Sequence, residues 1–312
     1  MRRKFLAATI RFGSLLLKFL STLGITRIGV GRANVGNLIT WAARKALITA
    51  AGKAPKAATT KGFTMYLGGA KEFQPGFLTG DYEAGTTRVV EGLLNEGCTF
   101  VDLGAHIGYY TLLAAKLVGK TGRVYSFEPD PGNFVLLFKN VTVNDYTDRV
   151  IPVQKAIVGH GERDKRLYFH STRTSSSSLY TLEGGRPESI AVEAVSLDEF
   201  FASIGWPKVD VVKMDIEGAE KEALEGMHDL VSRNPRLRLI VDYNELTISA
   251  AGVTAEEFIA TLKSLGFVNL SFCGAEGPIP LKLPDELSKL RKLAKKEISG
   301  SNLLCEQASS EI

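Results

Sequence analysis

Residues 101–117 read VDLGAHIGYYTLLAAKL, the most informative stretch of the chain. An apolar run ends on Asp102, a turn that contains Gly104 follows, and a helical pattern begins near Gly108. Gly104 lets the backbone turn sharply and approach a ligand, because it carries no Cβ. The helix start behind it offers free backbone N–H groups. The stretch therefore predicts a strand, a turn suited to a ligand, and a helix.

The glycine spacing argues against a dinucleotide loop. The GxGxxG fingerprint needs glycine where Asp102 stands and a third glycine three residues after the second. Neither is present, so binding of NAD or FAD through that fingerprint is disfavoured. An acidic residue in the first position suits a ligand with an ammonium group better than a pyrophosphate.

A second carboxylate ends the next apolar run, RVYSF at 123–127. Glu128 follows this run, and Pro129, Asp130 and a second proline continue the loop. A carboxylate at the tip of the second strand can accept both hydroxyls of a ribose. We therefore assign Glu128, Pro129 and Asp130 to cofactor binding.

A third group of acidic residues follows the apolar strand in VDVVKMDIEGAEKEALEG, residues 209–226. Asp215 and Glu217 stand where a parallel sheet binds ligands. Burial beside other carboxylates would raise the pKa of either residue, which suits a general base. The alternative is that these carboxylates only interact with a helix dipole.

His106 is a further candidate base, since its unperturbed pKa of about 6.5 suits proton removal from a hydroxyl. Packing or a cofactor contact are the alternatives for this residue. Asp215, Asp242 and Asn244 lie at the tips of adjacent predicted strands, where oxygen ligands can hold Mg²⁺. A fourth ligand is not evident, so no metal is predicted.

Apolar runs alternate with helical patterns from residue 63 onward, which is typical of an α/β protein with a largely parallel sheet. The expected strands are 99–103, 123–127, 150–156, 209–214, 237–243, 267–273 and 302–305. The expected helices are 84–95, 108–118, 131–144, 196–204, 218–231 and 254–264. Two helix starts carry capping boxes, and a hairpin is expected from runs 166–170 and 190–195.

In this order, the three motifs resemble the FkbM family of S-adenosylmethionine-dependent methyltransferases. The resemblance spans roughly residues 75–306. Its main motifs are DYEAGTTRVV at 81–90, VDLGAHIGYYT at 101–111, YSFEPDP at 125–131, VKMDIEGAE at 212–220 and NLLC at 302–305. It implies a class I methyltransferase Rossmann-like fold. In that fold a seven-stranded sheet, with six parallel strands and one antiparallel strand, carries helices on both faces.

The resemblance also implies S-adenosyl-L-methionine as the cofactor and gives the motif residues roles. It assigns the methionine end of the cofactor to Asp102, Gly104 and Gly108. Ala105, in the same turn, is also expected to bind the cofactor. It puts Glu128 on the ribose, and it puts Asp215 and Glu217 beside the reacting methyl group. Two positions depart from the family pattern: His106 replaces a more usual asparagine, and Asp242 a more usual glutamate.

The implied reaction moves a methyl group to an acceptor hydroxyl, on a sugar, glycan or lipid-linked natural product. The choice of an oxygen acceptor rests on the resemblance alone. One alternative is a membrane-docked, nucleoside-binding protein without catalysis. Another is an RNA methyltransferase recruited through basic residues, for which steep salt dependence would be the mark.

Charge is distributed very unevenly along the 312 residues. Residues 1–71 hold thirteen Lys or Arg and no Asp or Glu, whereas the whole chain has a formal net charge of only +4. Residues 1–24 predict an amphipathic helix with basic and apolar faces, suited to an anionic membrane surface. A mitochondrial transit peptide, nucleic-acid binding and docking on the protein's own body are the alternatives. We divide the chain into an extension, 1–62, and a methyltransferase domain, 63–312.

Composition narrows the class of protein further. Hydrophobic residues make up 45% of the chain and charged residues 23%, which excludes wholesale disorder. No run of 18 uncharged apolar residues occurs, so no transmembrane helix is expected. Three cysteines, with no CxxC pair, argue against a disulfide framework or a zinc site. We expect a cytoplasmic protein, peripheral on the inner membrane face, or a mitochondrial one in a eukaryote.

Overall fold

The structure of the protein is a computed structural model. It describes residues 56–58, 61–67, 76, 82–168, 178–180, 188–282, 286–295 and 301–308. The predicted amphipathic helix at 1–24 lies outside the described residues.

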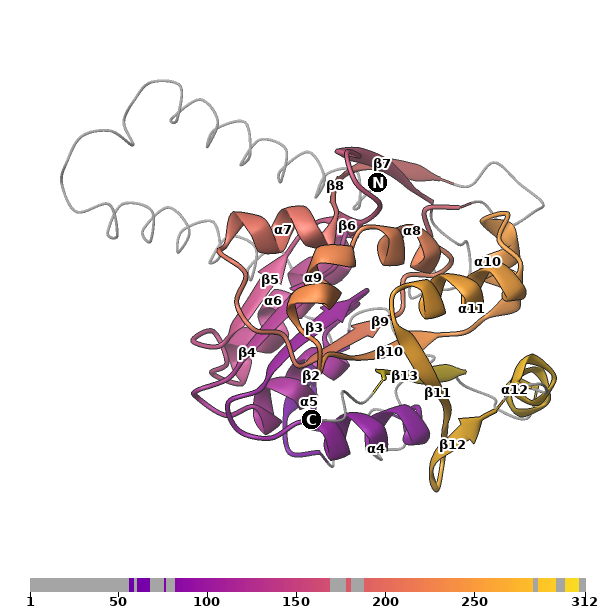
Figure 1. Cartoon of the computed structure of the whole chain (residues 1–312). Coiled ribbons are helices and arrows are strands. Elements are labelled where there is room, and N and C mark those ends of the chain that lie inside the picture. Colours follow the sequence, from indigo (N-terminus) through magenta and orange to yellow (C-terminus); the bar gives the residue numbers. More distant parts are fainter. Residues whose placement is uncertain are drawn as a thin grey trace.

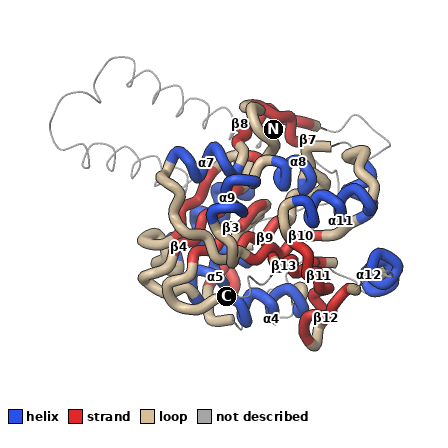
Figure 2. The backbone as a smooth tube through the Cα atoms, viewed as in Figure 1, coloured by secondary structure: helices blue, strands red, loops and turns tan. Residues whose placement is uncertain are grey.

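A mixed sheet of eight strands forms the centre of the described fold (Figures 1 and 2). In spatial order the strands are β12 (Gly277–Leu281), β11 (Phe267–Gly274), β13 (Asn302–Gln307), β10 (Arg238–Asp242), β9 (Val211–Met214), β3 (Thr99–Leu103), β4 (Arg123–Phe127) and β5 (Val150–Val153). Neighbours from β10 to β5 run parallel, and β13 runs antiparallel to both β10 and β11. This confirms the predicted seven-stranded arrangement, to which β12 adds an eighth strand.

The eighth strand was not predicted, because its sequence, GPIPL, does not have a strand pattern. Proline has no backbone N–H to donate, so it is tolerated in a sheet mainly at an edge. Pro278 and Pro280 satisfy this condition, since β12 pairs only with β11 and forms the end of the sheet.

Helices cover both faces of the sheet, as predicted. One face packs against α4 (Ala84–Leu93), α5 (Tyr109–Leu117) and α6 (Pro131–Val143). The other packs against α7 (Leu197–Ser203), α8 (Glu220–Glu225), α9 (His228–Arg233) and α11 (Ala255–Ser264). Side chains alternate along each strand: Phe100 and Val211 pack on the first face, and Val101 and Val212 on the second.

The helix expected at 218–231 is two short helices, α8 and α9, which meet at Gly226 and Met227. Gly226 lies so close to the backbone of a distant segment that a Cβ at this position would be 2.5 Å from the carbonyl oxygen of Val158. The close approach ends α8 and redirects the chain into α9.

The strand expected at 150–156 is also divided. After β5 the chain leaves the main sheet and forms β6 (Ala156–Ile157). This short strand pairs in parallel with β8 (Ser189–Val195), which pairs in antiparallel fashion with β7 (Asp164–Tyr168). The predicted hairpin is therefore present, and it belongs to a separate three-stranded sheet.

A short hairpin, β1 (Lys56–Ala58) with β2 (Thr64–Tyr66), precedes the main sheet. Two asparagines hold β2: Asn140, in α6, accepts from Tyr66 N at 2.5 Å, and Asn144, the residue after α6, accepts from Thr64 N at 2.8 Å. The predicted domain boundary after residue 62 therefore falls inside this hairpin.

All three cysteines are free thiols, which agrees with the predicted lack of a disulfide framework. Among the helices in the described part of the chain, none is both long and apolar enough to cross a bilayer.

Candidate active site

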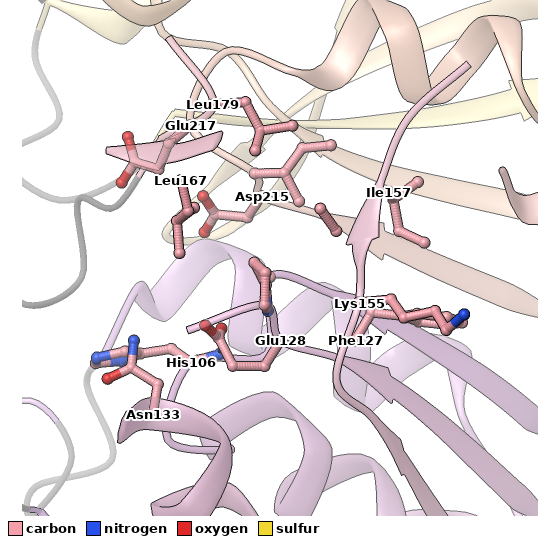
Figure 3. A pocket seen from close by; sticks show the side chains of 14 residues that line it. His106, Phe127, Glu128, Asn133, Lys155, Ile157, Leu167, Leu179, Asp215 and Glu217 are labelled. Atoms are coloured by element: carbon pink, nitrogen blue, oxygen red, sulfur yellow. The ribbon is translucent and has the colours of Figure 1, made fainter. Parts of the chain in front are cut away.

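A pocket lies at the carboxyl ends of β3, β4 and β9, the edge where parallel sheets bind ligands (Figure 3). Six predicted site residues line it: Gly104, His106, Glu128, Pro129, Asp215 and Glu217. In Figure 3, Asp215 and Glu217 face the pocket from the wall opposite Glu128 and His106. The structure thus brings together side chains from three separate motifs.

Gly104 shapes the floor of this pocket. Its φ of +80° lies in the left-handed region, and its N–H donates to the carbonyl of Phe127 at 3.0 Å. A Cβ at this position would lie 1.8 Å from the carbonyl oxygen of Asp215. Glycine is required here because two strand ends meet at a distance that no other residue permits.

We expect Gly104→Ala to abolish cofactor binding and to lower the thermal midpoint. The added methyl group must push the Asp215 strand end away, which widens and distorts the pocket. Gly161→Ala is a matched control, because Gly161 has the same φ of +80° but nothing within 4 Å of an added Cβ. This control isolates backbone strain, about 1 kcal/mol. Equal losses in both variants, measured by calorimetry and thermal unfolding, would contradict the steric argument.

The carboxylate of Glu128 is buried and oriented by the backbone. Its two oxygens accept hydrogen bonds from His106 N and from Asp130 N, both at 2.8 Å. Burial, with a smaller contribution from Asp130, raises the pKa of Glu128 to about 8. The Asn133 side chain also hydrogen-bonds to this carboxylate. A carboxylate has about four lone-pair sites, so the group is still suited to accept a ribose hydroxyl.

The other predicted cofactor residues support the pocket without lining it. Asp102 is 1% exposed and accepts a hydrogen bond from the Thr111 hydroxyl at 2.6 Å. Asp130 caps α6, and Ala105 is buried in the core. Gly108, at a φ of +98°, is the residue at which α5 begins.

A buried lysine fixes the carboxylate of Asp215. Lys213, 2% exposed, donates to Asp215 Oδ2 at 3.0 Å. Burial alone would lower the pKa of Lys213, but Asp215, Glu83 and Asp102 together raise it above its ordinary value. Lys213 therefore stays charged and holds the Asp215 side chain in one orientation.

The loop after Asp215 is shaped by its own acidic residues. Glu220 is buried and accepts from Ile216 N at 3.0 Å and from Gly218 N at 2.8 Å. Burial raises the pKa of Glu220 to about 7. Glu217 has a φ of +54°, and its carbonyl accepts from the Ser178 hydroxyl at 2.5 Å. Glu220 thus orders the turn that presents Glu217.

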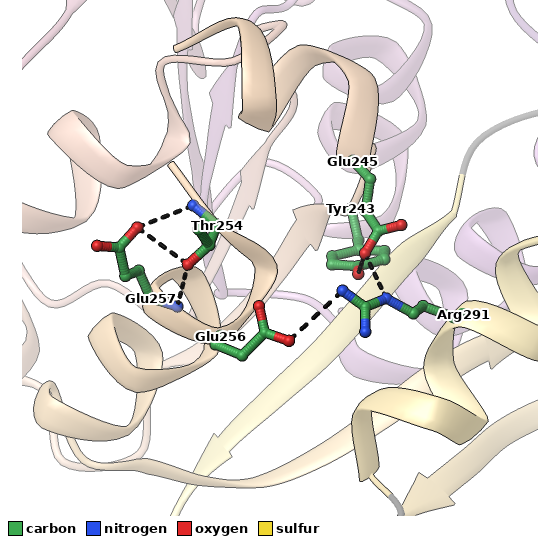
Figure 4. A network of polar contacts seen from close by, with 6 residues as sticks. All are labelled: Tyr243, Glu245, Thr254, Glu256, Glu257 and Arg291. Atoms are coloured by element: carbon green, nitrogen blue, oxygen red, sulfur yellow. Dashed lines mark hydrogen bonds and ion pairs between the residues drawn. The ribbon is translucent and has the colours of Figure 1, made fainter. Parts of the chain in front are cut away.

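Helix α10 (Glu245–Ala250) packs on this loop, since a Cβ on Gly218 would lie 2.7 Å from the carbonyl oxygen of Thr247. Figure 4 shows how α10 is fixed: the Tyr243 hydroxyl donates to Glu245 at 2.7 Å, and so does Arg291 Nε. Arg291 comes from α12 (Glu286–Ala294), at the far end of the sheet.

Both predicted capping boxes are present and begin helices that pack beside the site. Ser196 and Glu199 cap α7, and Thr254 and Glu257 cap α11 (Figure 4). Asn244, which the sequence suggested as a metal ligand, caps α10: its side-chain oxygen accepts a hydrogen bond from Leu246 N at 3.1 Å.

Several residues that line the pocket were not predicted from the sequence. They come from the start of α6, the end of β5, β6 and the hairpin: Asn133, Lys155, Ala156, Ile157, Leu167 and Leu179. The signal for the β5 end was available, since ligands bind where parallel strands end. The hairpin leucines carried no such signal, because their position depends on how the small sheet folds over the pocket.

The family model that describes the FkbM methyltransferase domain matches residues 102–268, more than half of the chain. The chain belongs to the FkbM methyltransferase family. The matched span begins at Asp102, includes every pocket residue named above, and ends in β11. Membership in this family supports S-adenosylmethionine as the cofactor predicted from the sequence.

Two curated relatives show how far the likeness extends. The chain is 30% identical over 128 residues to the hexuronic acid methyltransferase AglP of Haloferax volcanii. The aligned region covers 40% of this chain and 48% of AglP. The chain is also 26% identical over 202 residues to the 31-O-demethyl-FK506 methyltransferase FkbM of Streptomyces tacrolimicus, and that region covers 56% of this chain and 74% of the relative. The chain thus spans about half the length of AglP.

Among solved structures, the fold is similar to that of an S-adenosylmethionine-dependent O-methyltransferase from Thermotoga maritima. The structural alignment covers 73% of this chain and 66% of the other. The sequence identity is 13% and the TM-score 0.39.

Proposed function

We propose that this FkbM-family protein transfers the methyl group of S-adenosylmethionine to a hydroxyl of a sugar, glycan or lipid-linked natural product. The observation that carries the proposal is the shared pocket of Glu128 and Asp215. A residue suited to hold a ribose and a residue suited to accept a proton face one another across it (Figure 3).

The residues present fit the cofactor. Gly104 lines the pocket without a side chain and lets the Asp215 strand end approach closely, and Glu128 presents two oriented carboxylate oxygens. When bound, the cofactor supplies a methyl group activated by a sulfonium sulfur. The protein's task is then to align the acceptor and to exclude water.

Alignment and proton removal are the two contributions of the chain itself. Holding an acceptor oxygen in line can lower the barrier by about 7–11 kcal/mol in favourable cases. In the transfer the bond between the methyl group and sulfur would break as the C–O bond forms, with S-adenosylhomocysteine as the leaving group. We assign acceptance of the hydroxyl proton to Asp215. A general base of this kind contributes about 10²–10⁴-fold.

The names of the relatives and the sequence of residues 1–24 both support a sugar-containing or lipid-linked acceptor. One relative is named for a hexuronic acid and the other for the 31-O position of FK506. A lipid-linked acceptor would also suit the basic amphipathic pattern of residues 1–24, which predicts association with an anionic membrane.

The test uses full-length protein with methyl-labelled S-adenosylmethionine and a panel of acceptors. The panel contains hexuronic acid glycosides, neutral sugars, a lipid-linked sugar in vesicles and a structured RNA. We expect label in an alkali-stable ether on a sugar-containing acceptor. Label only in RNA would show instead that the protein is an RNA methyltransferase. Binding of the cofactor without transfer to any acceptor would favour a nucleoside-binding protein without catalysis.

A further inference from the structure

A polar cluster adjoins the pocket on the α4–α5 side of the sheet. It consists of Glu83, Lys213, Asp215, Asp242 and Asn302. Asp242 and Asn302 are paired neighbours on β10 and β13, and Glu83 immediately precedes α4. Asp215 belongs to both places, because it lines the pocket and binds Lys213 at 3.0 Å. The cluster is therefore continuous with the pocket.

Glu83 is held in an unusual conformation at the edge of this cluster. It is 8% exposed, and its φ of +42° lies in the left-handed region that a residue with a Cβ seldom adopts. Its Oε2 accepts from the Tyr110 hydroxyl at 2.9 Å and from Asn302 Nδ2 at 3.3 Å. Such conformations concentrate at binding and catalytic sites, and this one directs a buried carboxylate toward the cluster.

Asn302 supplies an independent indication of a ligand. The residue is 1% exposed, and its Nδ2 is committed to Glu83, which fixes the orientation of the amide. Its Oδ1 is buried and has no hydrogen-bond partner among the residues that the structure describes. A buried acceptor of this kind normally has a partner, so a donor is expected to join it there.

The charges indicate what kind of donor is expected. The carboxylates of Asp215, Glu83 and Asp102 all act electrostatically on the single ammonium group of Lys213, and Asp242 in turn interacts with Asp215 and Glu83. The carboxylates therefore outnumber the ammonium group, and a second positive charge would balance them better. Burial raises the pKa of Asp242, with a further contribution from Asp215, and an added cation would favour ionisation of both. Within the described residues, no three His, Cys, Asp or Glu side chains are spaced to hold a metal ion.

We propose that Glu83 and Asn302 bind the α-ammonium group of the cofactor's methionine moiety. This proposal rests on the proposed function. An ammonium group has three donors, and Glu83, Asn302 Oδ1 and Asp242 offer acceptors. The sequence indicated Asp102 for such a role, but Asp102 is bonded to Thr111 beneath the glycine turn. The cluster lies beyond Asp215, on the side of the site away from Glu128, so a cofactor whose ribose is held by Glu128 could present its amino-acid end there.

The test compares two ligands that share the adenosine part. S-adenosylhomocysteine carries the amino-acid end, whereas 5′-methylthioadenosine lacks it. We expect Glu83→Gln and Asn302→Leu each to weaken S-adenosylhomocysteine about 10- to 100-fold. The affinity for 5′-methylthioadenosine should change less than about twofold in both variants. Glu286→Gln is the matched control, because Glu286 is a buried carboxylate that pairs with Lys263 far from the site.

Each outcome of the calorimetry has a defined meaning. Equal weakening of both ligands would show a general distortion of the pocket and overturn the proposal. Unchanged affinity for S-adenosylhomocysteine in both variants would also overturn it, including the case in which only the acceptor's KM rises. If wild-type protein binds neither ligand, the proposed function fails first, and that result is distinct from the others.

Discussion

Replacing Glu128 with alanine is expected to weaken the binding of S-adenosylmethionine about 100-fold or more. The variant loses the carboxylate that we assign to the ribose hydroxyls, and hydrogen bonds to a charged group contribute about 1.5–3 kcal/mol each. Calorimetric titration of S-adenosylmethionine into wild type and variant measures the loss. NAD, titrated separately, should bind neither protein.

The same substitution should leave the fold intact. Folding raises the pKa of Glu128 from 4.5 to about 8, so the folded protein binds this proton more tightly than the unfolded chain. The stability that Glu128 contributes is therefore fully present below about pH 4.5 and is lost as the pH rises toward 8. The Glu128→Ala variant should therefore be less destabilised relative to wild type at pH 8 than at pH 4.5, and denaturant unfolding at the two pH values measures the difference.

A contrasting variant separates binding from stability. Asp198, in α7, is also a buried carboxylate that accepts two backbone hydrogen bonds, from Asp229 N and Leu230 N at the start of α9, and it does not line the pocket. We expect Asp198→Ala to reduce stability by about 1–3 kcal/mol and to leave cofactor affinity unchanged. If Glu128→Ala bound S-adenosylmethionine as tightly as wild type, the ribose role would have to be abandoned.

Ionisation of Glu128 also predicts how binding depends on pH. A carboxylate accepts hydrogen bonds from ribose hydroxyls better when it is charged. Since its pKa in the free protein is about 8, affinity should increase between pH 6 and pH 9, with release of a proton on binding. Titrations in buffers of different ionisation enthalpy measure that proton. Glu128→Ala should lack this pH dependence.

The geometry of a parallel sheet explains which parts of the site could be predicted from the sequence. Carboxyl ends of neighbouring parallel strands meet at one edge, so the ends at Gly104, Glu128 and Asp215 had to converge. That rule says where a strand ends but not which way each side chain points. Asp102 alternates to the α5 face and is buried, whereas Asp215 lies beyond its strand and reaches the pocket.

The features that escaped prediction depend on contacts between distant segments. Leu167 and Leu179 line the pocket only because the small sheet packs over it. Glu83 and Asn302 are 219 residues apart, and β13 has to enter the sheet beside β10 before their side chains can meet. Local periodicity carries no information about such pairs, although it located the strands that bring them together.

The largest kinetic effect is expected from Asp215→Asn. We expect kcat to fall about 10²–10⁴-fold, because the amide keeps a hydrogen-bond acceptor for Lys213 but cannot take the acceptor's proton. The affinity for S-adenosylmethionine should change far less, since Glu128 and the glycine turn are intact. Glu217→Gln and His106→Gln are the matched comparisons. We expect each to lower kcat less than about tenfold if Asp215 is the base.

The structure favours Asp215 for this role because its side chain is oriented by Lys213 at 3.0 Å, at the end of a central strand. Glu217 lies in the following turn, on backbone with a φ of +54°. The sizes of the losses in kcat distinguish the three candidates. If His106→Gln lowers kcat more than Asp215→Asn does, the histidine takes the proton. If all three variants retain kcat within about tenfold, alignment of the acceptor supplies the rate and no side chain acts as a base.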